Sequence, residues 1–236
     1  MNSGRVSTGI DVLDDLMSGG FQKGKTYLVS GEAGTGKTVF CLKYSLDGLA
    51  KGENVVYVTV DERPTHLVQD AATFGWDLDV PIREKKLCLI DITPQFSELR
   101  LGKFKGNVEN AKVFDEIRSY VKKVDAKRVI IDPIAPMFAS SENQFQLREY
   151  IRQLMFSLDE LGTTNLVTSI IDTGSNMISK FGVEEFFASG VIVLWIEREE
   201  MAYNRVMLVR KMRGTPIDLR VRKFGIDSKT GITLFG

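Results

Sequence analysis

The stretch of sequence that decides the fold is Gly31-Glu32-Ala33-Gly34-Thr35-Gly36-Lys37-Thr38. It fills every fixed position of the pattern G-x-x-x-x-G-K-[ST], known as the Walker A loop. Residues 26–30 before it are apolar and β-prone, and residues 39–49 after it have helical spacing without proline. The loop is therefore predicted to join a strand to a helix, which is the setting that separates this motif from a chance glycine-rich turn.

The residues of this loop are of the types that phosphate binding needs. Its glycines let successive backbone N–H groups point inward, and the positive end of the following helix adds to that field. Lys37 has the reach and the charge to contact the β- and γ-phosphates, and the Thr38 hydroxyl is a ligand for Mg²⁺. We predict a bound nucleotide whose contacts are Gly31, Gly34, Thr35, Gly36, Lys37, Thr38 and Val39.

Length and composition limit the class of protein. The chain has 236 residues, 43% of them hydrophobic, which suits one α/β domain, and we expect a single domain over residues 1–236. Its 31 basic residues balance 31 acidic ones, so it lacks the overall charge of a dedicated nucleic-acid binder. No apolar run is long enough to span a membrane or resembles a signal peptide, and we expect a cytoplasmic protein in which Cys41 and Cys88 are reduced core thiols.

Two acidic residues, Asp61 and Glu62, follow the apolar run 55–60, which reads as a strand covered on both faces. Ligands of open parallel sheets sit at the carboxyl ends of the strands, so a carboxylate here could act on the γ-phosphate through a water molecule. The alternative is a helix N-cap followed by a first-turn acid, because Pro64 suits an early helical position and residues 65–74 read as a helix. The pattern alone does not choose between them.

Residues 128–132 form a second apolar run, which ends in Asp132 and is interpreted as a Walker B strand. Asp132 is predicted to hold Mg²⁺ together with Thr38. The remaining strands alternate with helices until residue 170, and then three strands follow without helices between them. This order predicts an α/β fold with a mostly parallel central sheet flanked by helices and an antiparallel C-terminal β extension. The expected strands after the phosphate loop are 55–60, 87–92, 128–132, 164–170, 191–196, 205–210 and 220–226.

Residues 94–110 have little periodicity and are predicted to be an extended loop. Arg100, Lys103 and Lys105 in this loop either bind an acidic partner or are solvated. Residues 171–185 are predicted to be a second loop, at the carboxyl edge of the sheet.

Beyond the two Walker motifs, the chain resembles a single KaiC-type domain, a branch of the RecA/Rad51 superfamily of P-loop ATPases. The resemblance covers nearly the full length and implies a RecA-like fold. Its motifs are Ser7-Thr8-Gly9-Ile10 with Gly19-Gly20, the Walker A loop, Thr59-Val60-Asp61-Glu62, Phe74-Gly75-Trp76-Asp77-Leu78, Phe181-Gly182-Val183-Glu184-Glu185-Phe186, and Lys211-Met212-Arg213-Gly214-Thr215.

This resemblance implies a homo-oligomer, usually a hexameric ring, with ATP and Mg²⁺ held between neighbouring subunits. Lys211 and Arg213 match a K-x-R finger that reaches the γ-phosphate of the next subunit's ATP. On an extended strand this spacing sends both side chains to one face, where two cations would neutralise charge in phosphoryl transfer. Thr73 matches a position near the base and ribose.

Three departures from the family pattern change what is implied. The family usually has two glutamates where this chain has Asp61-Glu62, and an aspartate one methylene shorter is expected to make hydrolysis slow. Ile170 stands where the recombinase branch commonly has a Gln that senses the γ-phosphate. The adjacent Ser-Thr pair of the circadian protein's second domain is absent, since residues 184–187 occupy that neighbourhood, so an autokinase role is not supported.

The leading hypothesis is a slow oligomeric ATPase that acts as a nucleotide-dependent switch or timer for a protein partner. The proposed catalytic residues are Asp61, Glu62, Lys37, Lys211 and Arg213. One alternative is a recombinase paralogue that binds single-stranded DNA, although residues 133–146 and 171–185 contain few of the cations and aromatic residues that this requires. Another is an ATP-binding scaffold without turnover.

Overall fold

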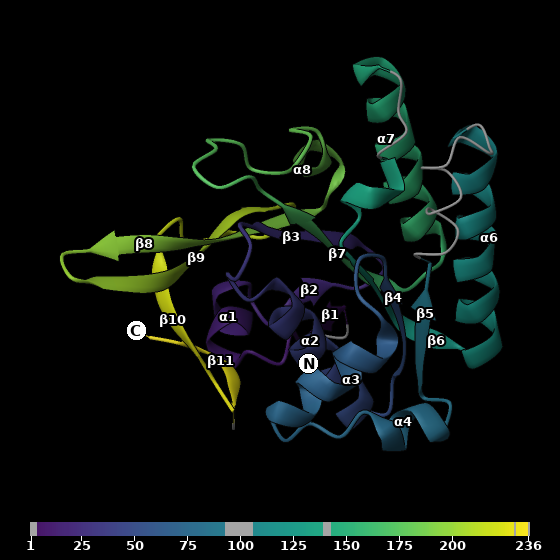
Figure 1. Ribbon diagram of the computed structural model, residues 1–236, viewed down its shortest axis with the longest axis horizontal. Helices are drawn as coiled ribbons and strands as arrows, with labels where there is room; N and C mark the ends of the chain where they lie inside the picture. The colour runs from purple at the N-terminus through teal and green to yellow at the C-terminus, as the bar shows by residue number, and fades with distance from the viewer. Residues whose placement is uncertain (1–3, 93–105, 139–142, 229, 236) are drawn as a thin grey trace.

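A nine-stranded sheet runs through the centre of the molecule, in the strand order β11-β10-β9-β8-β3-β7-β6-β4-β5 (Figure 1). The computed structural model describes residues 4–92, 106–138, 143–228 and 230–235. All strand pairs from β8 to β5 in that order are parallel. The bounds of these strands are β3 Thr26–Gly31, β4 Asn54–Thr59, β5 Leu87–Asp91, β6 Ala126–Asp132, β7 Thr164–Ile170 and β8 Gly190–Glu199.

The C-terminal strands extend this sheet on one side in antiparallel order. They are β9 Ala202–Met212, β10 Arg222–Asp227 and β11 Gly231–Leu234. The long hairpin of β8 and β9 projects away from the helices at the left of Figure 1. The predicted fold class, a mostly parallel sheet with an antiparallel C-terminal extension, is confirmed.

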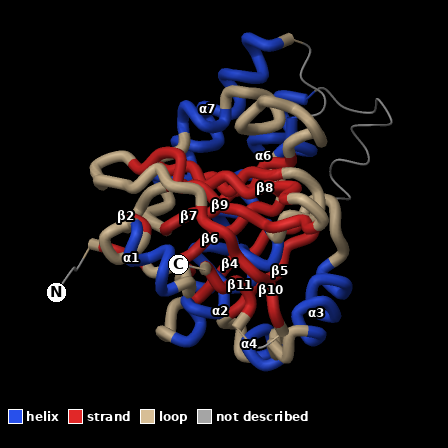
Figure 2. The backbone as a smooth tube through the Cα atoms, turned by 90° about the vertical axis from the view of Figure 1, so that its left-hand side faces the viewer, coloured by secondary structure: helices blue, strands red, loops and turns tan. Residues whose placement is uncertain are grey.

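Helices cover both faces of the sheet, which is why strands such as β3 and β7 are buried along nearly their whole length. One face packs against α1 (Asp11–Leu16), α2 (Lys37–Ala50), α3 (Pro64–Thr73) and the short α4 (Asp79–Arg83). The other packs against α6 (Gly106–Val124), the 3-10 turn η1 (Ala135–Phe138), α7 (Gln144–Glu160) and α8 (Glu184–Phe187). Figure 2 shows the strands enclosed between these two layers. A small two-stranded sheet, β1 (Arg5–Val6) and β2 (Phe21–Gln22), flanks α1.

The structure corrects the sequence prediction mainly at short elements. Helix α6 begins at Gly106, so the expected loop over residues 94–110 was wrong in its last residues. The rest of that loop, with Arg100, Lys103 and Lys105, lies outside the described residues. Helix α8 interrupts the end of the expected loop 171–185, and the edge strand β11 was not predicted. Helix α8 and strand β11, with four residues each, are too short to show a helical or strand period in sequence.

Two expectations from composition concern the thiols and the membrane. Cys41 is buried, Cys88 is partly buried, and both are free cysteines. Among the described helices, none has the length and apolar character to cross a bilayer.

Candidate nucleotide-binding site

The Walker A loop joins β3 to α2 as predicted, and two of its glycines, Gly31 and Gly36, stand where a side chain would be strained. A Cβ on Gly31 would lie 2.3 Å from the backbone oxygen of Leu194 on the neighbouring strand β8. Gly36 has a φ of +104° and packs against the Ile226 side chain, 2.6 Å from where a Cβ would stand. The loop therefore needs glycine both for its backbone conformation and for its close approach to β8 and β10.

Lys37 is held inside this loop. Its side chain is only 8% exposed, and Nζ donates to the backbone oxygens of Gly31 at 2.9 Å and Glu32 at 2.8 Å. Burial lowers the pKa of Lys37, while the Asp132 carboxylate acts in the opposite direction. The ammonium group thus lies inside the Walker A loop, residues 31–38, which we call the phosphate cradle. Its hydrogen bonds are made to backbone oxygens of the same loop.

Asp132 lies at the carboxyl end of β6 and accepts hydrogen bonds from three neighbouring elements. Thr38 Oγ1 and Tyr57 Oη donate to its Oδ2 at 2.8 and 2.9 Å, and Thr168 Oγ1 donates to Oδ1 at 2.5 Å. The structure therefore brings together the two residues predicted to hold the metal. A hydroxyl beside a carboxylate is a set of hard oxygen donors, which fits Mg²⁺. Tyr57 and Thr168 were not predicted, because an isolated strand hydroxyl gives no signal in sequence.

Asp61 and Glu62 follow β4 at the same edge of the sheet, and their surroundings differ. Asp61 is exposed, and Glu62 is partly buried. Burial raises the pKa of Glu62, and so do the nearby carboxylates of Asp70 and Asp132. The alternative that this pair caps the next helix was wrong, because Arg63 is the N-cap residue of α3 and makes no side-chain cap.

A cavity of about 310 Å³ opens beside the phosphate loop. It brings together the loop, the end of α3 and the C-terminal strands, since its lining comprises Gly34, Gly36, Lys37, Thr38, Val39, Phe74, Arg205 and Ile226. Arg205 Nε also donates to the backbone oxygen of Gly34 at 3.4 Å. The prediction did not include Arg205 or Ile226, because they come from strands far along the chain.

Thr73, which was predicted to lie near the base, is exposed at the end of α3. Its Oγ1 donates to the backbone oxygen of Asp70 at 2.7 Å. Thr73 is not among the described residues that line the cavity, whereas the adjacent Phe74 is. Phe74 belongs to a motif noted in the sequence, and its ring stacks on Trp76 with the centroids 4.9 Å apart.

Lys211 and Arg213, the predicted finger, lie together at the end of β9. Lys211 Nζ donates to the backbone oxygens of Glu185 at 2.7 Å and Ala188 at 2.8 Å, and the Arg213 guanidinium donates to that of Phe186 at 2.8 Å. Both side chains therefore point to the same short segment, as their spacing predicted. Burial lowers the pKa of Lys211 to about 8, and the charge of Arg213 adds to this effect.

The finger does not lie at the phosphate loop of its own chain. Lys211 pairs with Val191 and Val191 with Leu28, whereas the loop begins at Gly31, which pairs with Leu194. The finger is thus displaced toward the amino end of β3 by three residues, or roughly 10 Å along the strand. The structure does not bring these two parts of the predicted site together within one chain.

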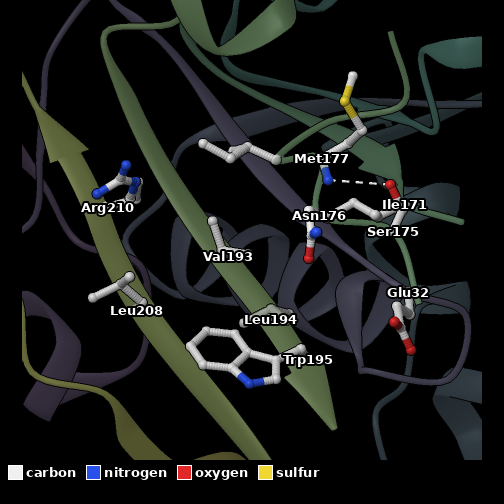
Figure 3. Close-up of a pocket in the computed structure, with 11 residues that line it drawn as sticks. Glu32, Ile171, Ser175, Asn176, Met177, Val193, Leu194, Trp195, Leu208 and Arg210 are labelled. Atoms are coloured by element: carbon white, nitrogen blue, oxygen red, sulfur yellow. Dashed lines mark hydrogen bonds between the residues drawn. The ribbon is translucent and has the colours of Figure 1, made fainter. Parts of the chain in front are cut away.

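A second cavity of about 290 Å³ lies between Glu32 of the phosphate loop, residues 175–178 of the loop after β7, and strands β8 and β9 (Figure 3). Glu32 of the loop lies on one side of it, and Leu208 and Arg210 of β9 lie across it. The backbone N–H of Gly174 donates to Glu32 Oε1 at 3.1 Å, and that of Ile171 donates to the Gly31 oxygen at 3.0 Å. The loop that follows β7 is therefore attached directly to the phosphate cradle.

Comparison with known proteins agrees with these features. The model of the family described as "ATPase: KaiC" matches residues 6–236. The circadian clock oscillator protein KaiC of Prochlorococcus marinus is 35% identical over 212 residues, which cover 89% of this chain and 42% of that protein. The circadian clock protein KaiC3 of a Synechocystis species is 30% identical, over 98% of this chain and 45% of that protein.

A solved structure resembles this chain over almost its whole length. It is the crystal structure of a KaiC-like protein from the archaeon Pyrococcus horikoshii OT3, with a TM-score of 0.85 and 33% identity. The match covers 98% of this chain and 99% of that one. In contrast, the chain spans less than half the length of the two curated relatives.

Proposed function

We propose that this chain, which belongs to the KaiC ATPase family, binds ATP with Mg²⁺ and hydrolyses it slowly. In this proposal residues 1–236 act as one ATPase domain in a homo-oligomer, and the nucleotide state of the oligomer is read by a partner protein. The observation that carries the proposal is the contact between the two Walker motifs, where Thr38 Oγ1 donates to Asp132 at 2.8 Å. That contact supports a metal site next to a phosphate cradle.

Each residue of the cradle has a role that its chemistry allows. The backbone N–H groups of the loop, together with Lys37, would bind the phosphates, and Thr38 and Asp132 would hold Mg²⁺. Bound Mg²⁺ neutralises charge on the phosphate oxygens. Val39 and Phe74 line the cavity beside the loop and offer apolar surface to the rest of the nucleotide.

Asp61 is proposed to orient the attacking water, with Glu62 as the neighbouring carboxylate. The family pattern favours the first acid of the pair for this role, and Asp61 is exposed at the carboxyl edge of the sheet. Its short side chain supports slow turnover, because a catalytic group misplaced by about 1 Å can cost on the order of a hundredfold in rate. Slow turnover suits a switch or timer, whose nucleotide state must persist long enough to be read.

The position of the finger supports a site shared between subunits. Lys211 and Arg213 are displaced from the cradle of their own chain, and both present cations that phosphoryl transfer can use. A head-to-tail contact between copies would bring this finger to the next cradle and would close into a ring. We propose a hexameric ring with ATP at each interface.

The experiment that tests this function is steady-state phosphate release from the purified chain with ATP and Mg²⁺. Lys37→Ala is the blank, since it removes the cation of the cradle and leaves the rest of the chain unchanged. Release by the wild-type chain above this blank is expected, together with a larger particle in light scattering when ATP-Mg²⁺ is present. Equal rates for both chains would leave only a nucleotide-binding scaffold.

Binding of single-stranded DNA is not proposed as a second function. Stacking platforms and a cationic groove are what such binding needs, and the described residues of segments 133–146 and 171–185 include a single cation, Lys180, which is paired with Asp172 at 2.7 Å. A gel-shift experiment with labelled single-stranded DNA tests this conclusion. A salt-dependent shift that is lost when Arg100, Lys103 and Lys105 are changed to Ala would make DNA binding the better-supported function.

A further inference from the structure

Glu184 is a carboxylate buried completely inside the molecule, at the first position of α8. Its oxygens accept from Ser169 Oγ at 2.9 Å and from Ser179 Oγ at 2.7 Å. The backbone N–H groups of Phe181 and Val183 donate to it as well, at 3.2 Å each to Oε2. A buried carboxylate is costly unless it is hydrogen-bonded, and here donors from a strand and a loop converge on it.

One of these donors, Ser169, lies on the strand β7, which also contacts the metal side of the candidate site. Ser169 lies on β7 directly after Thr168, whose hydroxyl donates to Asp132. Ser169 Oγ also accepts from the backbone N–H of Lys180 at 2.9 Å. Glu184 therefore joins the carboxyl end of β7 to the end of the loop that follows it.

On its other side, Glu184 begins the segment that holds the finger. The carbonyl oxygens that accept from Lys211 and Arg213 belong to Glu185, Phe186 and Ala188. These are within four residues of Glu184 in sequence, so fixing Glu184 fixes the carbonyl groups that orient the two cations. A path that alternates hydrogen bonds with backbone connections thus runs from Asp132 to the finger. Thr168 donates to Asp132, its neighbour Ser169 donates to Glu184, and the backbone that follows Glu184 accepts from Lys211 and Arg213.

We propose that Glu184 is a positioning residue that fixes the finger segment, residues 185–188, to the carboxyl end of β7, and that it thereby couples the metal site of one subunit to its own Lys211 and Arg213. The use of the finger on a neighbouring subunit's ATP rests on the function proposed above. The link bypasses Ile170, whose side chain has no hydrogen-bonding group. Its consequence is that the nucleotide bound by one subunit influences the site that the same subunit completes on its neighbour.

The test compares Glu184→Gln with Glu160→Gln, which removes the same charge from an exposed position at the end of α7. The first readout is the titration of Lys211, followed by trace labelling with acetic anhydride from pH 6 to 11 and mass spectrometry of its peptide. In the wild-type chain the pKa is expected near 8. In Glu184→Gln the loosened segment exposes the ammonium group, and the pKa is expected to rise toward its ordinary value of 10.5. An unchanged Lys211 titration in a folded Glu184→Gln chain would overturn the proposal.

The second readout combines two measurements on each variant. One is the rate of phosphate release, and the other is the affinity for a fluorescent ATP analogue. A displaced finger is expected to lower kcat by on the order of tenfold to a hundredfold, with the affinity of the cradle unchanged and Glu160→Gln like the wild type. Equal losses of affinity and kcat would indicate a general structural role and would also overturn the proposal.

A milder variant covers the case in which Glu184→Gln does not fold. Ser169→Ala removes the donor on β7 and leaves the Glu184 carboxylate in place, and a smaller shift of Lys211 in the same direction is expected. Failure of the ATPase function itself is recognised separately. In that case the wild-type chain releases no phosphate above Lys37→Ala, while the Lys211 titration still reports whether Glu184 fixes the finger segment.

Discussion

Asp61 and Glu62 are adjacent in the chain and differ by one methylene, yet their surroundings are different. Asp61 is exposed, while burial and the charges of Asp70 and Asp132 raise the pKa of Glu62. We predict that Asp61→Asn slows steady-state phosphate release more than Glu62→Gln, because the first acid is the proposed base and general-base catalysis contributes about a hundredfold or more. The opposite order of the two rates would assign the base to Glu62. Equal affinity for the ATP analogue in both variants is the control that the cradle is intact.

Asp14 is a residue whose ionisation belongs to folding. It is 8% exposed and accepts from the Thr8 backbone N–H and hydroxyl, both at 2.8 Å. Burial raises its pKa from 3.8 to about 6, with a smaller contribution from the charge of Asp47. Because the folded chain holds this proton more tightly than the unfolded one, the stabilisation is full below pH 3.8 and is lost as the pH rises through 6.

The expected result is a difference in slope between two variants at neighbouring positions. From pH 4 to pH 6 the free energy of unfolding of the wild-type chain should fall relative to that of Asp14→Asn, which cannot ionise. Urea unfolding at several pH values measures it. Asp15→Asn, at an exposed position, should run parallel to the wild type; if Asp14→Asn did so too, the raised pKa of Asp14 would be wrong.

The residues of the site divide into those that sequence could identify and those that it could not. Lys37, Thr38 and Asp132 carry local patterns, because a glycine loop and an acid after an apolar strand are both fixed by their immediate neighbours. Arg205 and Ile226 reach the cradle only because β9 folds back beside β8 and β10 beside β9. No pattern near them in sequence reports that contact.

At the scale of elements, helix α2 and strand β6 meet at a position without room for a side chain. Arg128 of β6 is 1% exposed and pairs with Asp47 at 2.9 Å and Glu53 at 2.6 Å. A Cβ on Gly48 would lie 2.6 Å from its Nε. The guanidinium also stacks over Tyr44, 4.5 Å from the ring centroid. The glycine in the last turn of this helix is therefore explained by packing.

We predict that Gly48→Ala destabilises the chain by about 1–3 kcal/mol, the usual cost of overpacking. Helix propensity alone predicts the opposite, a gain of about 1 kcal/mol. The two effects thus differ in sign, and urea unfolding separates them. Greater stability of Gly48→Ala would show that Arg128 moves aside at little cost.

The same scale explains which elements could be predicted. Strands β4 and β6 contain the continuous apolar runs 55–58 and 129–131, and long helices have a clear period, so the core of the fold followed from the sequence. Helix α8 has four residues and is fixed by hydrogen bonds to Glu184 from residues of β7 and the preceding loop. Its position depends on tertiary contacts, and a local pattern cannot contain that information.

At the scale of the whole molecule, the cradle and the finger are complete but lie apart in one chain. In a subunit on its own, no finger reaches the cradle that holds Lys37. Lys211 and Arg213 instead donate hydrogen bonds to backbone oxygens of their own chain. Activity should therefore depend on contact between copies. The Lys37→Ala and Arg213→Ala variants separate the two halves, since the first keeps the finger and the second keeps the cradle.

We predict that each variant alone is inactive and that a mixture of the two recovers activity. In an equal, random mixture, about one interface in four joins an intact cradle to an intact finger in a head-to-tail ring. Phosphate release per subunit should thus approach about a quarter of the wild-type rate, provided that the subunits are mixed as monomers before ATP-Mg²⁺ is added. Light scattering on the same sample checks that the particles have the wild-type size. If the finger instead acted within its own chain, no subunit in the mixture would carry both halves, and the rate would stay at the level of the separate variants.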